Sequence, residues 1–204
     1  MPPMAQIRKV CVYCGSSAGT DPAYVAAATR LGELLADSGI GLVYGGGSAG
    51  LMGALAKAMQ ARGGEIVGVI PEFLAAKERL FRDASEIVVT RGMHDRKQIM
   101  FERSDAFVAL PGGIGTLEEL VEQLTWAQLG RHKKPILIAN LGGFWNGLLG
   151  LFEHMDRAGF IHSANRLNFL VVDEVEEIVP ALQRAAAAVS EAEKAGEPET
   201  VERM

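Results

Sequence analysis

Cysteine is scarce in this chain of 204 residues, and no large excess of charge of one sign is present. The two cysteines, Cys11 and Cys14, are too few for a disulfide framework, so we expect free thiols and a reducing, cytoplasmic compartment. Twenty basic against 25 acidic residues leave a formal net charge of −5. Without a basic excess, the chain is not expected to bind nucleic acid or an anionic membrane through its overall charge.

Long hydrophobic runs are also missing, because glycine and charged residues interrupt every apolar stretch before it could span a bilayer. The first ten residues hold no long apolar segment, so we expect no secretory signal. Hydrophobic residues nevertheless make up 49% of the chain, which allows a sizeable core and excludes global disorder. We expect one domain over residues 1–189 and a polar, frayed tail over 190–204.

Short apolar runs alternate with helical patterns along nearly the whole chain. The runs expected to form buried strands are 10–13, 40–44, 65–70, 86–90, 106–110, 135–138 and 169–172. Helical patterns lie between them, including 49–61, a long segment from about residue 116, 145–155 and 174–188. Continuous apolar strands separated by helices are typical of a parallel sheet. The sequence therefore predicts an α/β fold, a single-domain, Rossmann-like, doubly wound parallel sheet with helices on both faces.

Three segments with glycine follow predicted strands, where ligands bind in such sheets. They are Cys14–Ser17, Gly45–Gly53 and Pro111–Glu119. The N–H groups of a glycine-rich loop at a helix N-terminus favour a bound phosphate. For one isolated loop a tight turn is an equally good explanation, but two such loops in a small domain favour nucleotide binding. The residues expected to form the phosphate loop are Gly45, Gly46, Gly47, Ser48 and Gly50.

Several nucleotide-dependent activities fit these loops poorly. Neither glycine-rich loop ends in the Gly-Lys-Ser/Thr of a Walker A motif. No acidic residue ends the strand 65–70 where it would suit a ribose diol, which disfavours an NAD(P)-dependent oxidoreductase. A phosphotransferase would need an acidic metal-binding pair. The four histidines form no cluster with cysteines or acids, so no metal is implied. A non-catalytic nucleotide-binding or carrier protein stays open as an alternative.

Charged residues stand at the starts of two predicted helices. Arg96 and Lys97 oppose the dipole of their helix, a conflict that a bound anion would remove, although solvated surface charges are the plainer alternative. In the helix from about residue 116, the apolar stripe consists of Leu117, Leu120, Val121 and Leu124. We expect this stripe to pack on the sheet, with Glu118 at its flank and Glu119 nearly opposite. Periodicity alone does not say which glutamate takes part in chemistry.

Taken together, these motifs resemble the LOG (Lonely Guy) family of cytokinin riboside 5′-monophosphate phosphoribohydrolases. The segments that carry the resemblance are Gly45–Gly53, Met93–Lys97, Pro111–Glu119 and Thr125–Gly130, which occur in the family's order. The similarity covers about residues 8–188. The PGGxGTxxE element is highly specific when the Met-His-Asp-Arg-Lys element accompanies it. The family has also carried the label lysine decarboxylase, but no pyridoxal-phosphate lysine motif is visible in this sequence.

The resemblance implies hydrolysis of the N-glycosidic bond of cytokinin riboside 5′-monophosphates or AMP, with release of the purine base and ribose 5-phosphate and without a cofactor. By position it makes Arg96 and Glu119 the catalytic pair. The substrate-binding residues carried over are Glu78, Lys97, Gly113, Ile114, Gly115, Thr116, Leu117, Glu118 and Thr125. The segment around Glu78 departs from the family's wording, and Ile114 replaces an aromatic residue frequent in plant members. The resemblance also implies a homodimer with the site near the subunit interface.

The implied reaction suits these residue types. Breaking an N-glycosidic bond builds positive, oxocarbenium-like charge on the ribose, which a carboxylate stabilises while it orients or deprotonates the attacking water. An arginine stays protonated at neutral pH, so the role expected of Arg96 is to clamp phosphate or sugar oxygens. The sequence does not identify the group that gives a proton to the departing purine.

Overall fold

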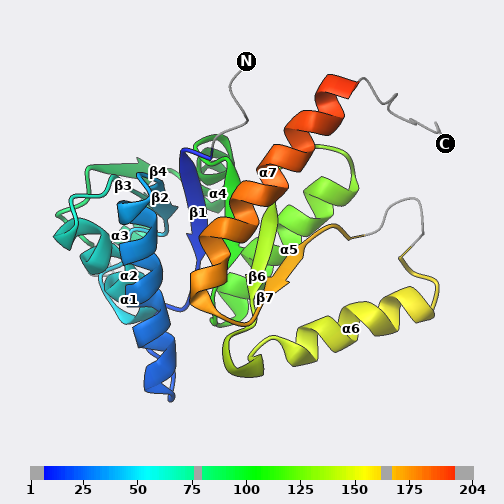
Figure 1. Ribbon diagram of the computed structural model, residues 1–204. Helices are drawn as coiled ribbons and strands as arrows, with labels where there is room; N and C mark the ends of the chain where they lie inside the picture. Colours follow the sequence, from blue (N-terminus) through cyan, green and yellow to red (C-terminus); the bar gives the residue numbers. More distant parts are fainter. Residues whose placement is uncertain (1–6, 76–79, 162–166, 196–204) are drawn as a thin grey trace.

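The computed structural model describes residues 7–75, 80–161 and 167–195. Within these residues, parallel strands form one seven-stranded sheet in the order β4-β3-β2-β1-β5-β6-β7 (Figure 1). The strands are β1 Lys9–Tyr13, β2 Gly41–Tyr44, β3 Ile66–Pro71, β4 Glu86–Thr90, β5 Ala106–Ala109, β6 Ile136–Ala139 and β7 Leu170–Val172. This is the doubly wound parallel sheet that the sequence predicts.

Helices cover both faces of the sheet (Figure 1). They are α1 Pro22–Asp37, α2 Gly50–Ala61, α3 Glu72–Ala75, α4 Met93–Glu102, α5 Ile114–Gln128, α6 Asn146–Arg157 and α7 Ile178–Ala195, with short 3₁₀ turns at Leu141–Gly143 and Val175–Glu177. One core layer packs α1, α2 and α7 on the sheet, and the other packs α4, α5 and α6. Alternate residues of β1 serve the two layers, since Val12 lies in the first and Tyr13 in the second.

The order of the strands reverses at β1. The chain moves outward from β1 through β2 and β3 to β4, and then returns to place β5 on the other side of β1. The carboxyl ends of β1 and β5 are therefore neighbours, and the loops that leave them run in opposite directions. In an open α/β sheet this switch point is where a crevice for ligands forms.

Several boundaries differ from the expected ones by one or a few residues, and two of them bear on the site and on the tail. Helix α5 begins at Ile114, two residues earlier than predicted, because the extended Gly113 caps it and its carbonyl accepts from the Leu117 amide at 3.0 Å. Helix α7 continues to Ala195, so residues 190–195 of the expected tail are helical. Residues 196–204 lie outside the described part of the chain. None of the described helices is long and apolar enough to cross a membrane.

Candidate active site

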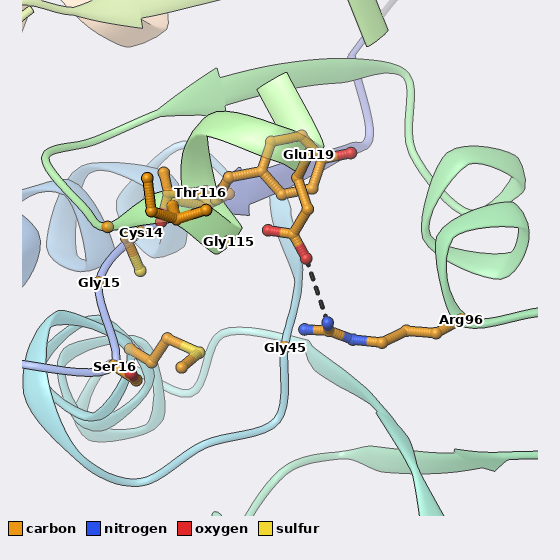
Figure 2. Close-up of a pocket in the computed structure, with 13 residues that line it drawn as sticks. Cys14, Gly15, Ser16, Gly45, Arg96, Gly115, Thr116 and Glu119 are labelled. Carbon is orange, nitrogen blue, oxygen red and sulfur yellow. Dashed lines mark ion pairs between the residues drawn. The ribbon is translucent and has the colours of Figure 1, made fainter. Parts of the chain in front are cut away.

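A cavity of about 280 Å³ lies at the switch point between β1 and β5. The segment after β1, the start of the loop after β2, helix α4 and the first turns of α5 each contribute to its wall (Figure 2). The lining residues are Val12, Tyr13, Cys14, Gly15, Ser16, Gly45, Met52, Arg96, Gly113, Ile114, Gly115, Thr116 and Glu119. The structure thus brings together the two residues expected to be catalytic and the start of the Pro111–Glu119 loop.

Glu119 extends from the second turn of α5 into this cavity, and its side chain is only 12% exposed. Burial raises the pKa of the Glu119 carboxyl to about 7, although the positive charge of Arg96 opposes this shift. Near neutral pH the group therefore exists in both protonation states, which is what a general acid or base requires.

Helix α5 packs on the sheet through most of its predicted apolar stripe, but it is rotated so that Glu119 faces inward. The residues of α5 that are buried are Thr116, Leu120, Gln123 and Leu124, whereas Val121 is 38% exposed. Glu119, expected nearly opposite the packed stripe, is turned inward, and the Glu118 side chain is 49% exposed. The placement predicted for Glu119 was wrong because apolar spacing does not register a buried polar partner, and Arg96 supplies one for Glu119.

Arg96 is 9% exposed, and three contacts with segments outside α4 hold its side chain. Its Nε donates to the carbonyl of Val69 on β3 at 3.0 Å, and its Nη1 lies 3.2 Å from Glu119 Oε1. The third contact is close packing of Nη2 against the backbone at Gly45. Figure 2 shows the Arg96 guanidinium and the Glu119 carboxylate pointing toward one another across the cavity. A planar group fixed on three sides presents its charge in one direction.

Carboxylates of α5 resolve the conflict between the α4 dipole and its two cations. Arg96 meets Glu119, and Lys97 Nζ lies 2.6 Å from Glu118 Oε1 and 2.9 Å from Glu122 Oε1. The sequence suggested that a bound anion would neutralise Arg96 and Lys97, but carboxylates of the protein neutralise them here. Lys97 and Glu118, both expected to contact the nucleotide, bind one another and do not line the cavity.

The N-terminus of α5 opens directly into the cavity through Gly113, Ile114, Gly115 and Thr116. The first N–H groups of a helix have no acceptor within the helix, and the dipole there favours an anion. Gly112 makes this arrangement possible, because a Cβ at that position would collide with the Thr116 side chain. This end of α5 can hold a phosphate group through backbone amides.

The loop after β2 was expected to be the phosphate loop, but most of it does not reach the cavity. Gly45 lines the cavity, while Gly46, Gly47, Ser48 and Gly50 do not. The first amides of α2 are already occupied, since Leu51 N and Met52 N donate to the Gly15 carbonyl at 3.0 and 3.4 Å. This hydrogen bonding ties the loop after β2 to the loop after β1, which leaves the N-terminus of α5 as the better phosphate site.

The remaining expected residues lie away from the cavity. Leu117 is partly buried in the core, and the exposed Thr125 donates its hydroxyl to the Val121 carbonyl at 2.8 Å. His94, the histidine of the Met-His-Asp-Arg-Lys element that was not among the expected site residues, is exposed and does not line the cavity either. Glu78 lies outside the described residues. The described residues also hold no group of three or more His, Cys, Asp or Glu side chains placed to bind a metal.

Sequence reasoning missed three cavity residues and left another segment without a role. Val12, Tyr13 and Met52 line the cavity, but the first two stand in a buried strand and the third in a helix, where their types indicate only core packing. The segment Cys14–Ser17 was placed correctly at a strand end, yet only the structure shows that Cys14, Gly15 and Ser16 form one wall. Their position after the strand beside the switch point was the available signal.

Replacing Gly45 by alanine is expected to lower activity while the protein remains folded. A Cβ at Gly45 would lie 2.6 Å from Arg96 Nη2 and 3.0 Å from Met52 Sδ, so the flexible Arg96 head must move away from its present contacts. A shift of this kind at a catalytic group costs about a hundredfold in rate. Steady-state rates and thermal unfolding would be compared with those of Gly147→Ala, since no neighbour lies within 4 Å of a Cβ at Gly147 and its φ is not positive. Parental activity in Gly45→Ala would contradict the tight placement of Arg96.

Comparison with known protein sequences identifies relatives over most of the chain. Residues 52–182 match the family described as "Possible lysine decarboxylase". The chain is 45% identical to the probable cytokinin riboside 5′-monophosphate phosphoribohydrolase LOG4 of Oryza sativa subsp. japonica, over 89% of this chain and 79% of that protein. It is 42% identical to the cytokinin riboside 5′-monophosphate phosphoribohydrolase LOG7 of Arabidopsis thaliana, over 88% of this chain and 82% of that protein.

Solved structures share the fold at lower identity. The molybdenum cofactor carrier protein of Chlamydomonas reinhardtii superposes with a TM-score of 0.68 and 24% identity, covering 89% of this chain and 99% of that one. The molybdenum cofactor binding protein of Rippkaea orientalis gives a TM-score of 0.66 and 20% identity, covering 88% and 97%. At these identities the likeness supports the Rossmann-like architecture and not a shared ligand.

Proposed function

This chain belongs to the LOG family, and from that membership we propose that it hydrolyses the N-glycosidic bond of cytokinin riboside 5′-monophosphates, AMP or both. The products are the free purine base and ribose 5-phosphate. The observation that carries the proposal is the buried Arg96–Glu119 pair, with its 3.2 Å contact, in a cavity that the N-terminus of α5 also enters. A phosphorylated ribose suits a cavity that has an anion site at one end and, at the other, a carboxyl group whose pKa is raised to about 7.

In this proposal the substrate lies along α5. The 5′-phosphate binds the amides at the start of α5, around Gly113–Thr116. Glu119 stands about one helical turn further on, roughly 5.4 Å along the axis, which is the scale of a ribose between its phosphate and its anomeric carbon. The anomeric carbon then lies beside the Glu119 carboxylate, and the base extends toward Arg96 and Met52.

Glu119 and Arg96 divide the chemistry between them. As the bond from ribose to purine breaks, the Glu119 carboxylate stabilises the oxocarbenium-like charge and accepts a proton from the attacking water. The water oxygen bonds to the anomeric carbon, and the purine leaves with the bonding electron pair and takes up a proton from solvent. Glu119 then returns the proton that it accepted to solvent. Arg96 holds the carboxylate in place and offers its remaining N–H groups to sugar oxygens.

The label lysine decarboxylase finds no support in this cavity. None of the described residues that line it is a lysine. Lys97 directly follows the lining residue Arg96 in the sequence, but its Nζ donates hydrogen bonds to the carboxylates of Glu118 and Glu122. A pyridoxal-phosphate enzyme of that kind requires a lysine amine free to form a Schiff base.

The proposal is tested by incubating purified protein with AMP, isopentenyl-AMP, dAMP and adenosine and separating the products by chromatography. Free base is expected from the monophosphates and not from adenosine, because adenosine lacks the group that the α5 amides bind. The rates with AMP and isopentenyl-AMP rank the two substrates. Nucleotide binding without any release of base would instead favour a carrier protein.

We further propose that the protein is a homodimer through the face formed by α5 and α6, in a reducing, cytoplasmic compartment that suits its buried free thiols. No residue of α6 is buried, and Leu151 and Met155 are 46% and 37% exposed. On α5, Val121 and Leu129 are 38% and 75% exposed. In Figure 1, α6 extends outward from the body of the molecule. Apolar surface on two neighbouring helices is typical of an interface between copies of one chain.

Replacing Leu151 by glutamate is expected to convert the dimer to a monomer, because the charge would be buried between the two copies. Light scattering after size-exclusion chromatography measures the mass directly. The matched control is Phe73→Glu on α3, where a large apolar side chain is 49% exposed away from α5 and α6. A parental chain of monomeric mass, or an unchanged dimer in Leu151→Glu, would rule out this interface.

A further inference from the structure

The segment after β1 forms a wall of the cavity that none of the catalytic roles above uses. Cys14, Gly15 and Ser16 all line the cavity, together with residues at the start of α5. Cys14 and Gly15 are buried, whereas Ser16 is exposed. Figure 2 shows Ser16 at the lower left of the cavity, Gly115 above it at the start of α5, and Arg96 at the right. The hydroxyl of Ser16 is therefore the polar side chain of this wall that is open to a ligand.

The backbone on either side of Ser16 is fixed by the other two loops. The Gly15 amide donates to the Pro111 carbonyl at 3.1 Å, and the Gly15 carbonyl accepts from the amides of Leu51 and Met52. Gly50, with φ +58°, packs so closely on this segment that a Cβ there would collide with the backbone of Ser16. An exposed side chain on a backbone held in this way has a defined position, as a binding residue needs.

Ser17 offers a natural comparison within the same segment. Its Oγ accepts a hydrogen bond from the Gly19 amide at 3.4 Å, and Ser17 does not line the cavity. No hydrogen bond joins the Ser16 hydroxyl to any other residue in the described part of the chain. The two neighbouring serines thus differ in the feature that matters for binding, which is access to the cavity.

We propose that Ser16 is a further substrate-binding residue, whose hydroxyl donates to the 5′-phosphate from the side opposite the α5 amides. This inference rests on the proposed function and extends it, because a phosphate at a helix N-terminus can accept further hydrogen bonds on the side that faces away from the helix. A hydroxyl adds a charge-assisted hydrogen bond there without adding charge, which is compatible with release of ribose 5-phosphate after the reaction.

The test compares Ser16→Ala and Ser16→Asp with Ser17→Ala. Ser16→Ala is expected to raise KM for the nucleoside monophosphate and the inhibition constant of ribose 5-phosphate by about tenfold, the usual effect of losing one hydrogen bond to a charged group. Ser16→Asp should weaken both further, because its carboxylate repels phosphate. The inhibition constant of the free base, which carries no phosphate, should stay unchanged, as should all constants in Ser17→Ala.

Ribose 5-phosphate binding is also measured by calorimetry, which does not depend on turnover. If the parent releases no base but binds ribose 5-phosphate, and Ser16→Ala weakens that binding, the hydrolase proposal fails and the phosphate contact stands. If Ser16→Ala binds ribose 5-phosphate like the parent, or if Ser17→Ala is weakened equally, the assignment of Ser16 is overturned. An equal loss of affinity for the free base would also overturn it, since that pattern indicates a distorted loop.

Discussion

Replacing Glu119 by glutamine is expected to reduce kcat by about a thousandfold, within the range for loss of a general base and its electrostatic stabilisation. Glutamine has nearly the same shape and can still accept a hydrogen bond from Arg96, so the cavity should persist. It carries no negative charge to oppose the oxocarbenium-like ribose and cannot take a proton from water. Because substrate binding depends mainly on the α5 amides, KM should change far less than kcat.

The pH dependence of the parent enzyme provides a second readout for Glu119. Burial raises the pKa of this carboxyl to about 7, and the carboxylate is the active form in the proposed mechanism. We therefore expect kcat/KM of the parent to rise with pH through a midpoint near 7. The residual rate of Glu119→Gln should lack this rise, because the titrating group is gone.

Stability should respond to the same substitution with a defined sign. The pKa of Glu119 in the fold, about 7, exceeds its ordinary value of 4.5, so the folded protein holds this proton more tightly than the unfolded chain does. The stability associated with that proton is present below pH 4.5 and is lost as pH rises through about 7. Relative to the parent, Glu119→Gln should therefore gain free energy of unfolding over this interval, as chemical denaturation at several pH values would measure.

A matched variant separates the catalytic effect from a general loss of charge. Glu176, in the 3₁₀ turn before α7, is 58% exposed in its side chain and forms a 3.3 Å ion pair with Arg30. Glu176→Gln should keep parental kcat and the parental pH profile. If Glu119→Gln retained a substantial fraction of kcat, or kept a rise near pH 7, another group would have to be the base.

Much of the architecture is predictable from local patterns. The strand 86–90 coincides with β4, and the alternation of apolar runs with helical segments identifies the parallel sheet. The two loops that meet at the switch point, after β1 and β5, also follow from their position after strands. These features depend on short-range periodicity and on glycine, both of which are visible along the chain.

The details of the site depend on contacts between distant segments, which local patterns do not contain. The apolar stripe of α5 placed Glu119 on the wrong side, because its partner Arg96 lies on another helix. The glycines after β2 suggested a phosphate loop, but the Gly15 carbonyl occupies the amides of Leu51 and Met52. The sequence of a glycine-rich loop is the same whether its backbone N–H groups are free or already hydrogen-bonded. Only the tertiary structure distinguishes the two cases.

Replacing Arg96 by lysine is expected to lower kcat/KM by about a hundredfold or more even though the charge is kept. Arg96 uses Nε for the Val69 carbonyl and Nη1 for Glu119, and its Nη2 packs on Gly45. A lysine ammonium is a single donor centre and cannot make the contacts to Val69 and Glu119 with the same geometry. The Glu119 carboxylate would lose its fixed orientation toward the anomeric carbon, and the sugar oxygens would lose hydrogen bonds from the guanidinium.

Replacing Arg96 by methionine removes the charge as well, and this separates orientation from electrostatics. The positive charge of Arg96 is the largest influence that lowers the pKa of Glu119 against the effect of burial. Without it, the pKa of Glu119 should rise above 7, so the remaining activity of Arg96→Met should appear only at higher pH than in the parent. Arg96→Lys, which keeps a cation near the carboxylate, should retain a midpoint closer to 7.

Profiles of kcat/KM against pH for the parent, Arg96→Lys and Arg96→Met test this order of midpoints. An unshifted midpoint in Arg96→Met would show that Arg96 and Glu119 are not coupled. Coupling is what the geometry requires, because a buried carboxylate remains charged at neutral pH only beside a fixed cation.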